Sequence, residues 1–324
     1  MPEVSPSVLI IRLDGIGDAL ALTPLVATLR RRGVPVDIVL RRENAGIFSS
    51  RALRAETIAA LALRSSSKSN LAAIERLGAE LRERAYTHVL VATEDPGGYR
   101  LARAVGAPVR AGFADPWGKP LKALWTRGLL TDSIYRSAGL DRRGPHECEA
   151  LFALGSSLTG AERPTRDLAE LRPLVLEREP EPDERVAVQI TAKYERLGIR
   201  LEEVVELIRR LETSSELHLL SARREASYAQ RIADATGLRV TYFDALEPWK
   251  EAIAGAAAIV TPDSGALHVA GMLGTPVVAI FPPHRDYALQ VARWAPWAAP
   301  HRVVRADAGW PLRAGDALAS LRSA

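Results

Sequence analysis

The chain of 324 residues is 47% hydrophobic and 25% charged, a composition typical of a soluble globular protein long enough for two domains. The early apolar run over residues 8–11 is too short for a signal peptide or a membrane span. Cys148 is the single cysteine, which excludes an internal disulfide, so we expect a protein of the reducing cytoplasm. The sequence has neither zinc-type Cys and His spacing nor an Asp-x-Asp motif, and we therefore expect no metal site.

Charge is divided unequally along the chain. Residues 1–150 hold 22 Lys and Arg against 16 Asp and Glu, a net charge of +6, whereas the remainder carries −2. A basic half suits an anionic partner such as a phosphorylated glycolipid, a membrane surface or nucleic acid. We expect no nucleic-acid partner, because no aromatic series accompanies the basic residues. The alternative is that the excess charge lies only on solvated helix faces.

Short apolar runs predict the strands of the first half at Val8–Leu13, Val36–Leu40 and His88–Ala92. The apolar spacing from Leu71 to Ala85 indicates a helix. Residues 115–131 lack a clear period and are interpreted as an ordered loop or a broken helix. The acidic, Pro-rich hexad at 179–184 cannot continue a helix or a central strand, so it predicts a linker.

Strands and helices alternate again after this linker. We predict strands at 186–190, 217–220, 240–243, 258–260 and 277–281, with helices at 201–211, 224–236, 248–256 and 266–273 between and beside them. Such alternation with short turns predicts parallel sheets covered by helices on both faces. The predicted fold class is α/β, with two Rossmann-like domains facing across an interdomain cleft. We place the first domain at 1–165, the linker at 166–184, the second domain at 185–300 and a final segment at 301–324.

The turn after the first strand holds the first candidate site. Gly15 and Gly17 permit a tight turn with close backbone approach, and Asp18 follows at the start of a helix. Leu20 replaces the third glycine of the dinucleotide pattern Gly-x-Gly-x-x-Gly, which argues against a nicotinamide or flavin enzyme. Asp18 is interpreted either as a general base or as a charge that stabilises the helix start.

Asp14 lies four residues before Asp18. Two carboxylates that close would raise the pKa of one of them, which suits a base. Pairing of Asp14 with Arg12 is the plainer interpretation and is ranked first.

A second candidate site follows the strand at 258–260. Asp263 lies in a Pro-Asp-Ser-Gly turn, Ser264 and Gly265 begin the next helix, and His268 lies within its first turns. Ser and Gly at a helix start leave backbone N–H groups available to an anion. In open α/β sheets, such a cluster at the carboxyl end of a strand holds a nucleotide or a sugar phosphate. The alternative is a capped helix in which His268 is a satisfied histidine of the inner face.

Three segments carry a resemblance to a known family: residues 8–18 with the Gly-Asp turn, residues 146–155, and residues 263–281 with Asp-Ser-Gly-Ala-Leu-His-Val-Ala. They resemble glycosyltransferase family 9, the lipopolysaccharide heptosyltransferases. The resemblance implies a GT-B fold in which the final segment crosses back to the first domain. It implies inverting, metal-independent sugar transfer without a cofactor, with ADP-heptose as donor. The implied acceptor is the lipopolysaccharide core or another glycolipid or polysaccharide, met by a cytoplasmic protein in peripheral contact with the inner membrane face.

The same resemblance implies residue roles. Asp18 is the implied general base, and Asp263 accepts a hydrogen bond from a sugar hydroxyl. The backbone amides of Ser264 and Gly265 bind the donor diphosphate, and His268 contacts the donor.

The chain departs from the family after the strand at 186–190. The family shows His-Pro-Gly and then a Lys two residues before a Trp, and this chain has no Lys-x-Trp. We expect Lys193 first and Arg196 second to hold the diphosphate, because one cation must replace the missing lysine. Thr191 can donate a hydroxyl. Glu225 is positioned as a ribose ligand, or else is a surface acid.

Basic residues near the ends of the predicted strands are the candidates for binding an anionic acceptor, namely Arg41, Arg42, Arg64 and Lys68. Three alternatives stay open: a transferase of the same fold that uses another nucleotide sugar, a nucleotide-sugar 2-epimerase, and a nucleotide-sugar-binding protein without catalysis.

Overall fold

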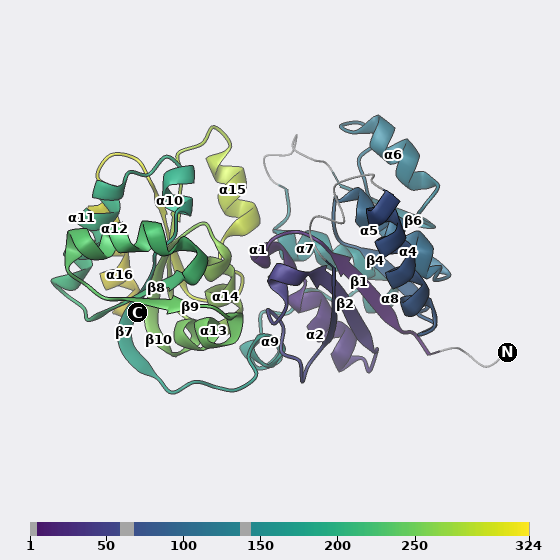
Figure 1. The fold of residues 1–324 in the computed structure, drawn as a ribbon, viewed down its shortest axis with the longest axis horizontal. Coiled ribbons are helices and arrows are strands. Elements are labelled where there is room, and N and C mark those ends of the chain that lie inside the picture. The colour runs from purple at the N-terminus through teal and green to yellow at the C-terminus, as the bar shows by residue number, and fades with distance from the viewer. Residues whose placement is uncertain (1–4, 59–67, 137–143, 324) are drawn as a thin grey trace. The chain divides into compact units, whose positions relative to one another are not determined.

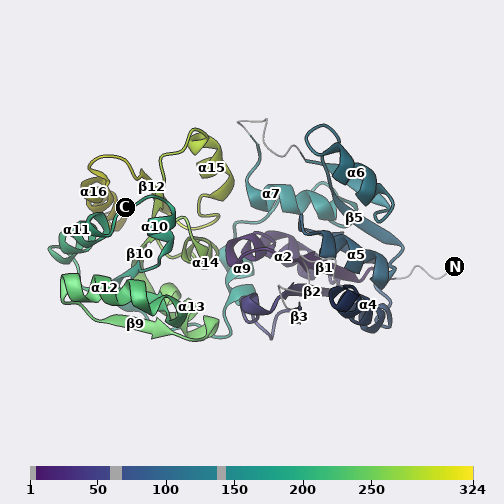
Figure 2. The same ribbon diagram turned by 45° about the horizontal axis from the view of Figure 1, so that its top comes forward.

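The computed structural model describes residues 5–58, 68–136 and 144–323. The chain divides into two compact units, Met1–Thr165 and Arg166–Ala324. Each unit is built around its own six-stranded sheet, with helices on both faces (Figures 1 and 2). Every strand pair in the described residues is parallel, which confirms the predicted α/β fold with two Rossmann-like sheets.

The first unit contains a sheet in the order β3-β2-β1-β4-β5-β6. Its elements are β1 Val8–Arg12, α1 Ile16–Leu20, α2 Thr23–Arg31, β2 Val36–Arg41, η1 Arg42–Asn44, β3 Arg54–Ile58, α4 Lys68–Arg82, β4 His88–Val91, α5 Pro96–Val105, β5 Val109–Ala114, α6 Pro120–Arg127, β6 Asp132–Tyr135, α7 Glu147–Phe152, η2 Ala153–Gly155 and α8 Ser156–Thr159.

The central strand of this sheet is β1, and all five of its residues are buried. On one face, Leu9 and Ile11 pack with apolar side chains of β2, β4, α4 and α5. A strand buried on both faces needs apolar residues at every position, which is why Val8–Ile11 is a continuous apolar run. Arg12 ends the run and begins the site described below.

The second unit contains a sheet in the order β12-β11-β10-β7-β8-β9. Its elements are α9 Leu168–Val175, β7 Asp183–Gln189, α10 Lys193–Arg196, α11 Leu201–Glu212, β8 Leu217–Ala222, η3 Arg223–Glu225, α12 Ala226–Thr236, β9 Val240–Phe243, α13 Leu246–Gly255, β10 Ala256–Pro262, α14 Gly265–Leu273, β11 Val277–Phe281, α15 Tyr287–Trp294, β12 His301–Arg305 and α16 Trp310–Arg322. Across the described residues of both units, no helix combines the length and the apolar character needed to span a bilayer.

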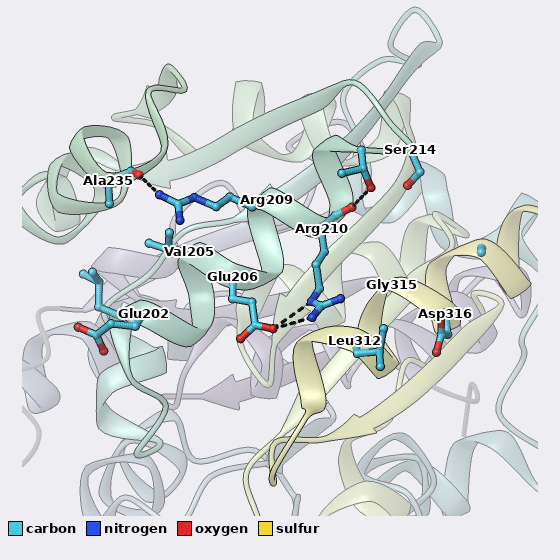
Figure 3. Close-up of a pocket in the computed structure, with 13 residues that line it drawn as sticks. Glu202, Val205, Glu206, Arg209, Arg210, Ser214, Ala235, Leu312, Gly315 and Asp316 are labelled. Carbon is cyan, nitrogen blue, oxygen red and sulfur yellow. Dashed lines mark hydrogen bonds and ion pairs between the residues drawn. The ribbon is translucent and has the colours of Figure 1, made fainter.

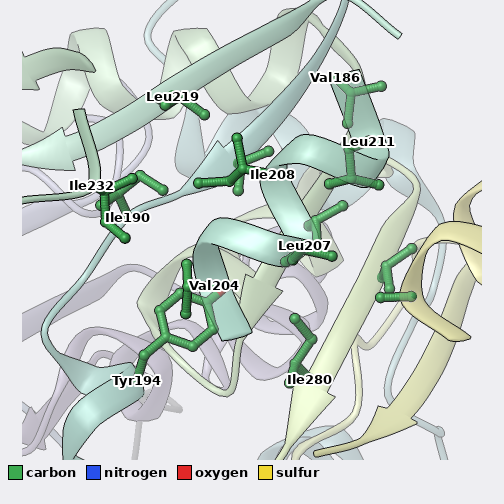
Figure 4. Close-up of a cluster of buried hydrophobic side chains, with 14 of the residues drawn as sticks. Val186, Ile190, Tyr194, Val204, Leu207, Ile208, Leu211, Leu219, Ile232 and Ile280 are labelled. Carbon is green, nitrogen blue, oxygen red and sulfur yellow. The ribbon is translucent and has the colours of Figure 1, made fainter. Parts of the chain in front are cut away.

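The core of the second unit lies between the sheet and the helices α11, α12 and α16 (Figure 4). The inward face of α11 is Val204, Leu207, Ile208 and Leu211, at the three- and four-residue spacing of one helix face. Helices α13 and α14 contact strands of the same sheet from outside this cluster. The sheet is therefore covered on both faces, and only its edges and loop ends reach solvent.

Four strands are absent from the predicted set, namely β3, β5, β6 and β12. Three of them, β3, β6 and β12, are edge strands of their sheets. An edge strand is only partly covered, so it does not need a long apolar run, and the apolar signal that identifies central strands is weak there. In the region interpreted as an ordered loop or broken helix, the structure has the short helix α6.

Residues 166–184 pack as part of the second unit rather than as an extended linker. Helix α9 packs against α14 and buries Leu171, Leu174 and Val175. Strand β7 begins at Asp183, inside the acidic hexad that we expected to exclude a strand. Asp183 pairs with Arg185 at 2.7 Å, which neutralises the acidic strand end.

Lys250 of α13 contacts the end of α9 and is completely buried. Its ammonium group donates to the Val175 carbonyl at the end of α9 and pairs with Glu247 at 2.6 Å. Burial lowers the pKa of Lys250, and the Glu247 carboxylate opposes that shift.

The C-terminal segment is also built into the second unit, whereas we expected it to cross back to the first domain. Helix α16 packs on α11 and contacts β10, β11 and β12. Trp310, Ala314 and Leu318 recur every four residues and join the core cluster. This spacing gives α16 an apolar stripe that the second sheet covers.

Leu318→Ala tests that packing. Leu318 is 2% exposed, so truncation leaves a cavity, and we expect the free energy of unfolding to fall by about 2–5 kcal/mol. The control is Leu312→Ala on the same helix, where the side chain is 52% exposed and a change within about 0.5 kcal/mol is expected. Urea unfolding of the full chain measures both. Equal effects of the two variants would mean that α16 does not pack in the core.

Candidate functional site

Arg12, the last residue of β1, is the centre of the candidate site in the first unit. It is 4% exposed, and its guanidinium donates to the Ala92 carbonyl. Its Nη2 lies 2.8 Å from Asp18 Oδ1 and 3.4 Å from Glu147 Oε1. A buried guanidinium requires such partners, because an unpaired charge is costly to remove from water.

Asp18 is fixed by two contacts, one from the end of β1 and one from its own turn. Besides the Arg12 ion pair, its Oδ2 accepts a hydrogen bond from the Gly15 backbone N–H at 3.0 Å. A Cβ atom on Gly15 would lie 3.2 Å from that oxygen, so the glycine leaves room for the carboxylate. Gly17 is the second residue of α1. The Asp18 side chain stays 33% exposed, which leaves it accessible to a substrate.

Asp14 also contacts Arg12, with Oδ2 at 3.5 Å from Nε. This is the plainer of the two arrangements expected from the sequence. The Asp14 backbone carbonyl accepts a hydrogen bond from Asn44 Nδ2 at 2.7 Å. The loop after β1 is thereby tied to η1, which follows β2.

Glu147, the first residue of α7, is 2% exposed and joins Arg12 to Arg136. Its Oε1 lies 3.1 Å from Arg136 Nη1, and its Oε2 accepts from Arg136 Nη2. Sequence reasoning included Glu147 only within a helix that resembles the family, and it did not identify Arg136. The available signal was an acid at the first position of a short helix, where the helix dipole favours negative charge.

Three of the four predicted acceptor-binding residues lie within the described residues. Arg41 ends β2, and Arg42 begins η1, so both lie at the carboxyl edge of the sheet beside the Asp14 loop. Lys68 is the first residue of α4. Arg64 lies outside the described residues.

In the second unit, the start of α14 is the candidate anion site. Ser264 is the residue before the helix, but no side chain caps the helix. The Ser264 hydroxyl pairs instead with the Thr261 hydroxyl at 2.9 Å. The first-turn N–H groups, beginning at Gly265, therefore have no side-chain acceptor at the positive end of the helix dipole.

Lys193, the first residue of α10 after β7, reaches the same place. Its Nζ lies 3.6 Å from Asp263 Oδ2, directly before α14. The pairing follows from the sheet order, because β7 and β10 are neighbours and run parallel. The Thr191 hydroxyl accepts from the Lys193 backbone N–H at 3.2 Å and so shapes the start of α10.

Arg196, the last residue of α10, contacts Glu225 of η3. Its Nη2 lies 3.7 Å from Glu225 Oε1, and its side chain is 67% exposed. The structure thus separates the two predicted cations: Lys193 adjoins Asp263 and α14, whereas Arg196 adjoins Glu225.

His268, in α14, packs its ring edge-to-face against Trp294 of α15, with centroids 5.5 Å apart. The side chain is half-buried. This contact orients the imidazole within the helix and leaves part of it exposed.

A separate hollow of about 810 Å³ lies between α11 and α16 (Figure 3). Two of its arginines have partners in the groove: Arg210 Nη2 lies 2.9 Å from Glu206 Oε1, and Arg209 donates to the Ala235 carbonyl. None of the predicted site residues lines it. The lining comes mostly from the facing surfaces of α11 and α16, and we assign no site to it.

Comparison with known proteins supports the family resemblance for part of the chain. Residues 202–314 match the model of "Glycosyltransferase family 9 (heptosyltransferase)". The resemblance read from residues 263–281 falls inside this segment. No curated protein sequence matches the chain significantly. The matched family indicates a glycosyltransferase.

Solved structures share the fold over the whole chain. A glycosyltransferase family 9 structure from Veillonella parvula has a TM-score of 0.74 at 12% identity and covers 100% of this chain and 99% of its own. E. coli heptosyltransferase WaaC with ADP has a TM-score of 0.73 at 19% identity, with 98% and 99% covered. E. coli ADP-heptose lps heptosyltransferase II has a TM-score of 0.69 at 20% identity, with 98% of each chain covered. These similarities confirm the predicted GT-B type of fold.

Glu147→Gln tests the buried charge network of the first unit. It removes the carboxylate that faces both Arg12 and Arg136, and loss of one partner of a buried ion pair costs about 3–5 kcal/mol of unfolding free energy. The matched control is Glu162→Gln, which also removes a carboxylate from two arginines, Arg31 and Arg32, but at the surface. Exposed pairs contribute little, so this control should unfold like the parent in urea. Equal stability of Glu147→Gln and the parent would contradict the network.

Proposed function

We propose that the protein is an inverting, metal-independent glycosyltransferase that moves heptose from ADP-heptose to a glycolipid acceptor of the lipopolysaccharide-core type. The observation that carries the proposal is the start of α14, where uncapped N–H groups lie beside the Lys193–Asp263 pair. This feature lies partly within the segment that matches the family.

The donor diphosphate binds at α14 in this proposal. Backbone N–H groups of Gly265 and its successor face the phosphate oxygens, where the helix dipole favours negative charge. When the donor binds, the Lys193 ammonium group exchanges its partner, from the Asp263 carboxylate to a phosphate oxygen. Asp263 is then available to accept a hydrogen bond from a sugar hydroxyl.

The identity of the donor is carried over from the structural neighbours. E. coli WaaC is known with ADP and with ADP-2-deoxy-2-fluoro heptose, the second structure having a TM-score of 0.70 at 19% identity. In this chain Glu225 is the candidate for the ribose hydroxyls, and Arg196 lies 3.7 Å from its carboxylate. His268 contacts the donor from the exposed part of its ring.

Asp18 is the general base of the proposed reaction. It takes the proton of the attacking acceptor hydroxyl as that oxygen forms a bond to the anomeric carbon. The bond from this carbon to the diphosphate breaks on the opposite side, and ADP leaves with the electron pair. Arg12 and the Gly15 N–H hold the carboxylate in one orientation while it accepts the proton.

The acceptor is anionic in this proposal, and Arg41 and Arg42 are its candidate ligands. Both lie at the carboxyl edge of the first sheet, next to the loop that carries Asp14. Guanidinium groups bind phosphate oxygens through paired N–H donors. Arg64 and Lys68 complete the proposed set.

One observation favours a second candidate, a transferase that uses another nucleotide sugar. The family pattern Lys-x-Trp is missing, and Tyr194, which follows Lys193, is completely buried rather than placed at the donor. The same departure suits a nucleotide-sugar-binding protein without turnover. Donor screening distinguishes these functions.

The thermal stability of the parent is therefore measured with ADP-, UDP-, GDP- and dTDP-sugars. A ligand that binds only the folded state stabilises it by about 2.7 kcal/mol at a hundred times its dissociation constant. We expect ADP-heptose to raise the melting temperature most. A larger shift with another nucleotide would replace the proposed donor, and binding without turnover on any acceptor would favour the binding protein.

Lys193→Ala tests the diphosphate site. A charge-assisted contact contributes roughly 1.5–3 kcal/mol, so turnover should fall about tenfold to a hundredfold. Arg196→Ala is the matched comparison, since this cation contacts Glu225 instead of Asp263. We expect a smaller loss there, measured as kcat and as the thermal shift with donor. If both variants keep full turnover, the diphosphate is held elsewhere.

Asp18→Asn tests the base. The amide keeps the shape but cannot take the proton, so turnover should fall by roughly 10²–10⁴-fold with little change in donor affinity. Asp14→Asn is the control, because Asp14 also contacts Arg12 and its loss changes the same local charge. A drop of equal size in both variants would point to the charge around Arg12 and not to proton transfer.

A further inference from the structure

A single nitrogen atom of Arg12 is shared by two carboxylates. Its Nη2 lies 2.8 Å from Asp18 Oδ1 and 3.4 Å from Glu147 Oε1. The other terminal nitrogen, Nη1, donates to the Ala92 carbonyl directly after β4, and Nε lies 3.5 Å from Asp14 Oδ2. Asp18 and Glu147 therefore compete for one donor group, and Asp18 has the shorter contact.

Burial alone should give Glu147 the advantage in this competition. Its side chain is 2% exposed, whereas that of Asp18 is 33% exposed and can be hydrated. Opposite charges attract more strongly where water is excluded, so a buried carboxylate with a single cation would draw that cation close. The long contact from Glu147 to Arg12 thus needs another cause.

Arg136 supplies that cause. Its Nη1 lies 3.1 Å from Glu147 Oε1, and its Nη2 donates to Oε2, so the guanidinium holds both carboxylate oxygens. Both contacts are shorter than the 3.4 Å from Glu147 to Arg12. Arg136 is the main partner of Glu147, and Arg12 is left to Asp18.

Contacts with the neighbouring strand fix Arg136 itself. It directly follows β6, and its backbone N–H donates to the Ala114 carbonyl at the end of β5 at 3.2 Å. Its guanidinium lies 4.9 Å from the centre of the Phe113 ring, a cation–π contact. These two contacts do not involve Glu147, so Arg136 is a fixed support for that carboxylate.

The Glu147 carboxylate is available for this role because its neighbours cap α7. His146 Nδ1 accepts from the Cys148 backbone N–H at 3.1 Å, and Glu149 accepts from the His146 backbone N–H at 2.9 Å. These bonds satisfy N–H groups at the helix start without Glu147. Its side chain contacts the two arginines instead.

We propose that Arg136 is a positioning residue for Asp18, acting through Glu147 and Arg12. By holding Glu147, it leaves Arg12 Nη2 to Asp18 and so keeps the Asp18 carboxylate in one orientation. The inference rests on the proposed function only for the role of Asp18 as the base. The arrangement of the four side chains does not depend on that role.

Arg136→Met tests the positioning role. Glu147 then keeps only Arg12 and should draw its Nη2 away from Asp18. We expect kcat to fall about tenfold to a hundredfold, because the base is displaced from the reacting hydroxyl. The acidic limb of the kcat/KM profile should move up by about one pH unit, since a carboxylate that loses a neighbouring cation is protonated more readily. An unchanged acidic limb would overturn the proposal.

Arg84→Met is the matched control. Arg84 pairs with Asp37 at 3.1 Å and with Glu56 at 2.5 Å, and its side chain is 24% exposed against 23% for Arg136. Asp37 lies near the amino end of β2, at the opposite edge of the sheet from Asp18. This variant should unfold more easily in urea, but its kcat and acidic limb should match the parent. An equal shift of the limb in both variants would assign the effect to general loss of charge and overturn the proposal.

Adding Glu147→Gln to Arg136→Met separates positioning from folding. Glutamine removes the carboxylate that competes for Arg12 Nη2, so Asp18 regains its partner. We expect the double variant to recover most of the lost kcat and to regain the acidic limb of the parent. It should also resist urea better than Arg136→Met, because a buried carboxylate with too few partners is gone. A double variant no more active than Arg136→Met would show a structural role alone.

Arg136→Lys replaces the methionine variant if that protein does not fold. Lysine keeps the charge, but its ammonium group cannot hold both carboxylate oxygens in the paired geometry of a guanidinium. We expect a smaller loss of kcat than for a neutral side chain, together with a longer distance from Arg12 to Asp18. A kcat equal to that of the parent would overturn the proposal.

Crystal structures of the parent and of Arg136→Met give a measurement that needs no turnover. In the variant, the distance from Arg12 to Glu147 should shorten and the hydrogen bond from Arg12 to Asp18 should break. If the parent transfers no heptose from ADP-heptose, the proposed function fails, and these distances still decide the positioning role. An intact Arg12–Asp18 hydrogen bond in the variant would overturn it.

Discussion

A parallel sheet ends all of its strands at one edge, and the chemistry of each unit depends on that constraint. In the first unit, Asp18 follows β1 and Arg41 ends β2, so residues distant in sequence share an edge. In the second unit, Lys193 follows β7 and Asp263 follows β10, which is the neighbouring strand. The 3.6 Å contact of these two side chains is a direct result of strand order.

At the edge of the first unit, charge compensation governs what each side chain can do. Arg12 is buried and has three carboxylates around it, those of Asp14, Asp18 and Glu147. Glu147 is itself shared with Arg136, so the buried pair does not depend on Asp18 alone. The Asp18 carboxylate is consequently positioned by Arg12 but remains partly open to solvent.

Sequence patterns predicted the central strands because burial on both faces requires continuous apolar runs, as in Val8–Ile11 and Val277–Phe281. The edge strand β12, His301–Arg305, has only two apolar residues, which lie between polar ones, and gave no such signal. Lys193 and Asp263 were each identified, yet their contact was not, because it depends on β7 pairing with β10. The bridge from Arg12 to Glu147 spans 135 residues, a distance over which local periodicity carries no information.

The hydrogen bonds of Asp18 are compatible with the proposed role of this ion-paired carboxylate as a base. One oxygen accepts from Arg12 and the other from the Gly15 N–H. A carboxylate has about four lone-pair positions, so two bonds leave acceptor capacity on both oxygens. The same two bonds fix the orientation of the carboxylate before any substrate binds, and a base held in this way needs no reorganisation at the moment of proton transfer. Gly15 leaves this oxygen uncrowded, since a Cβ atom at that position would lie 3.2 Å from it.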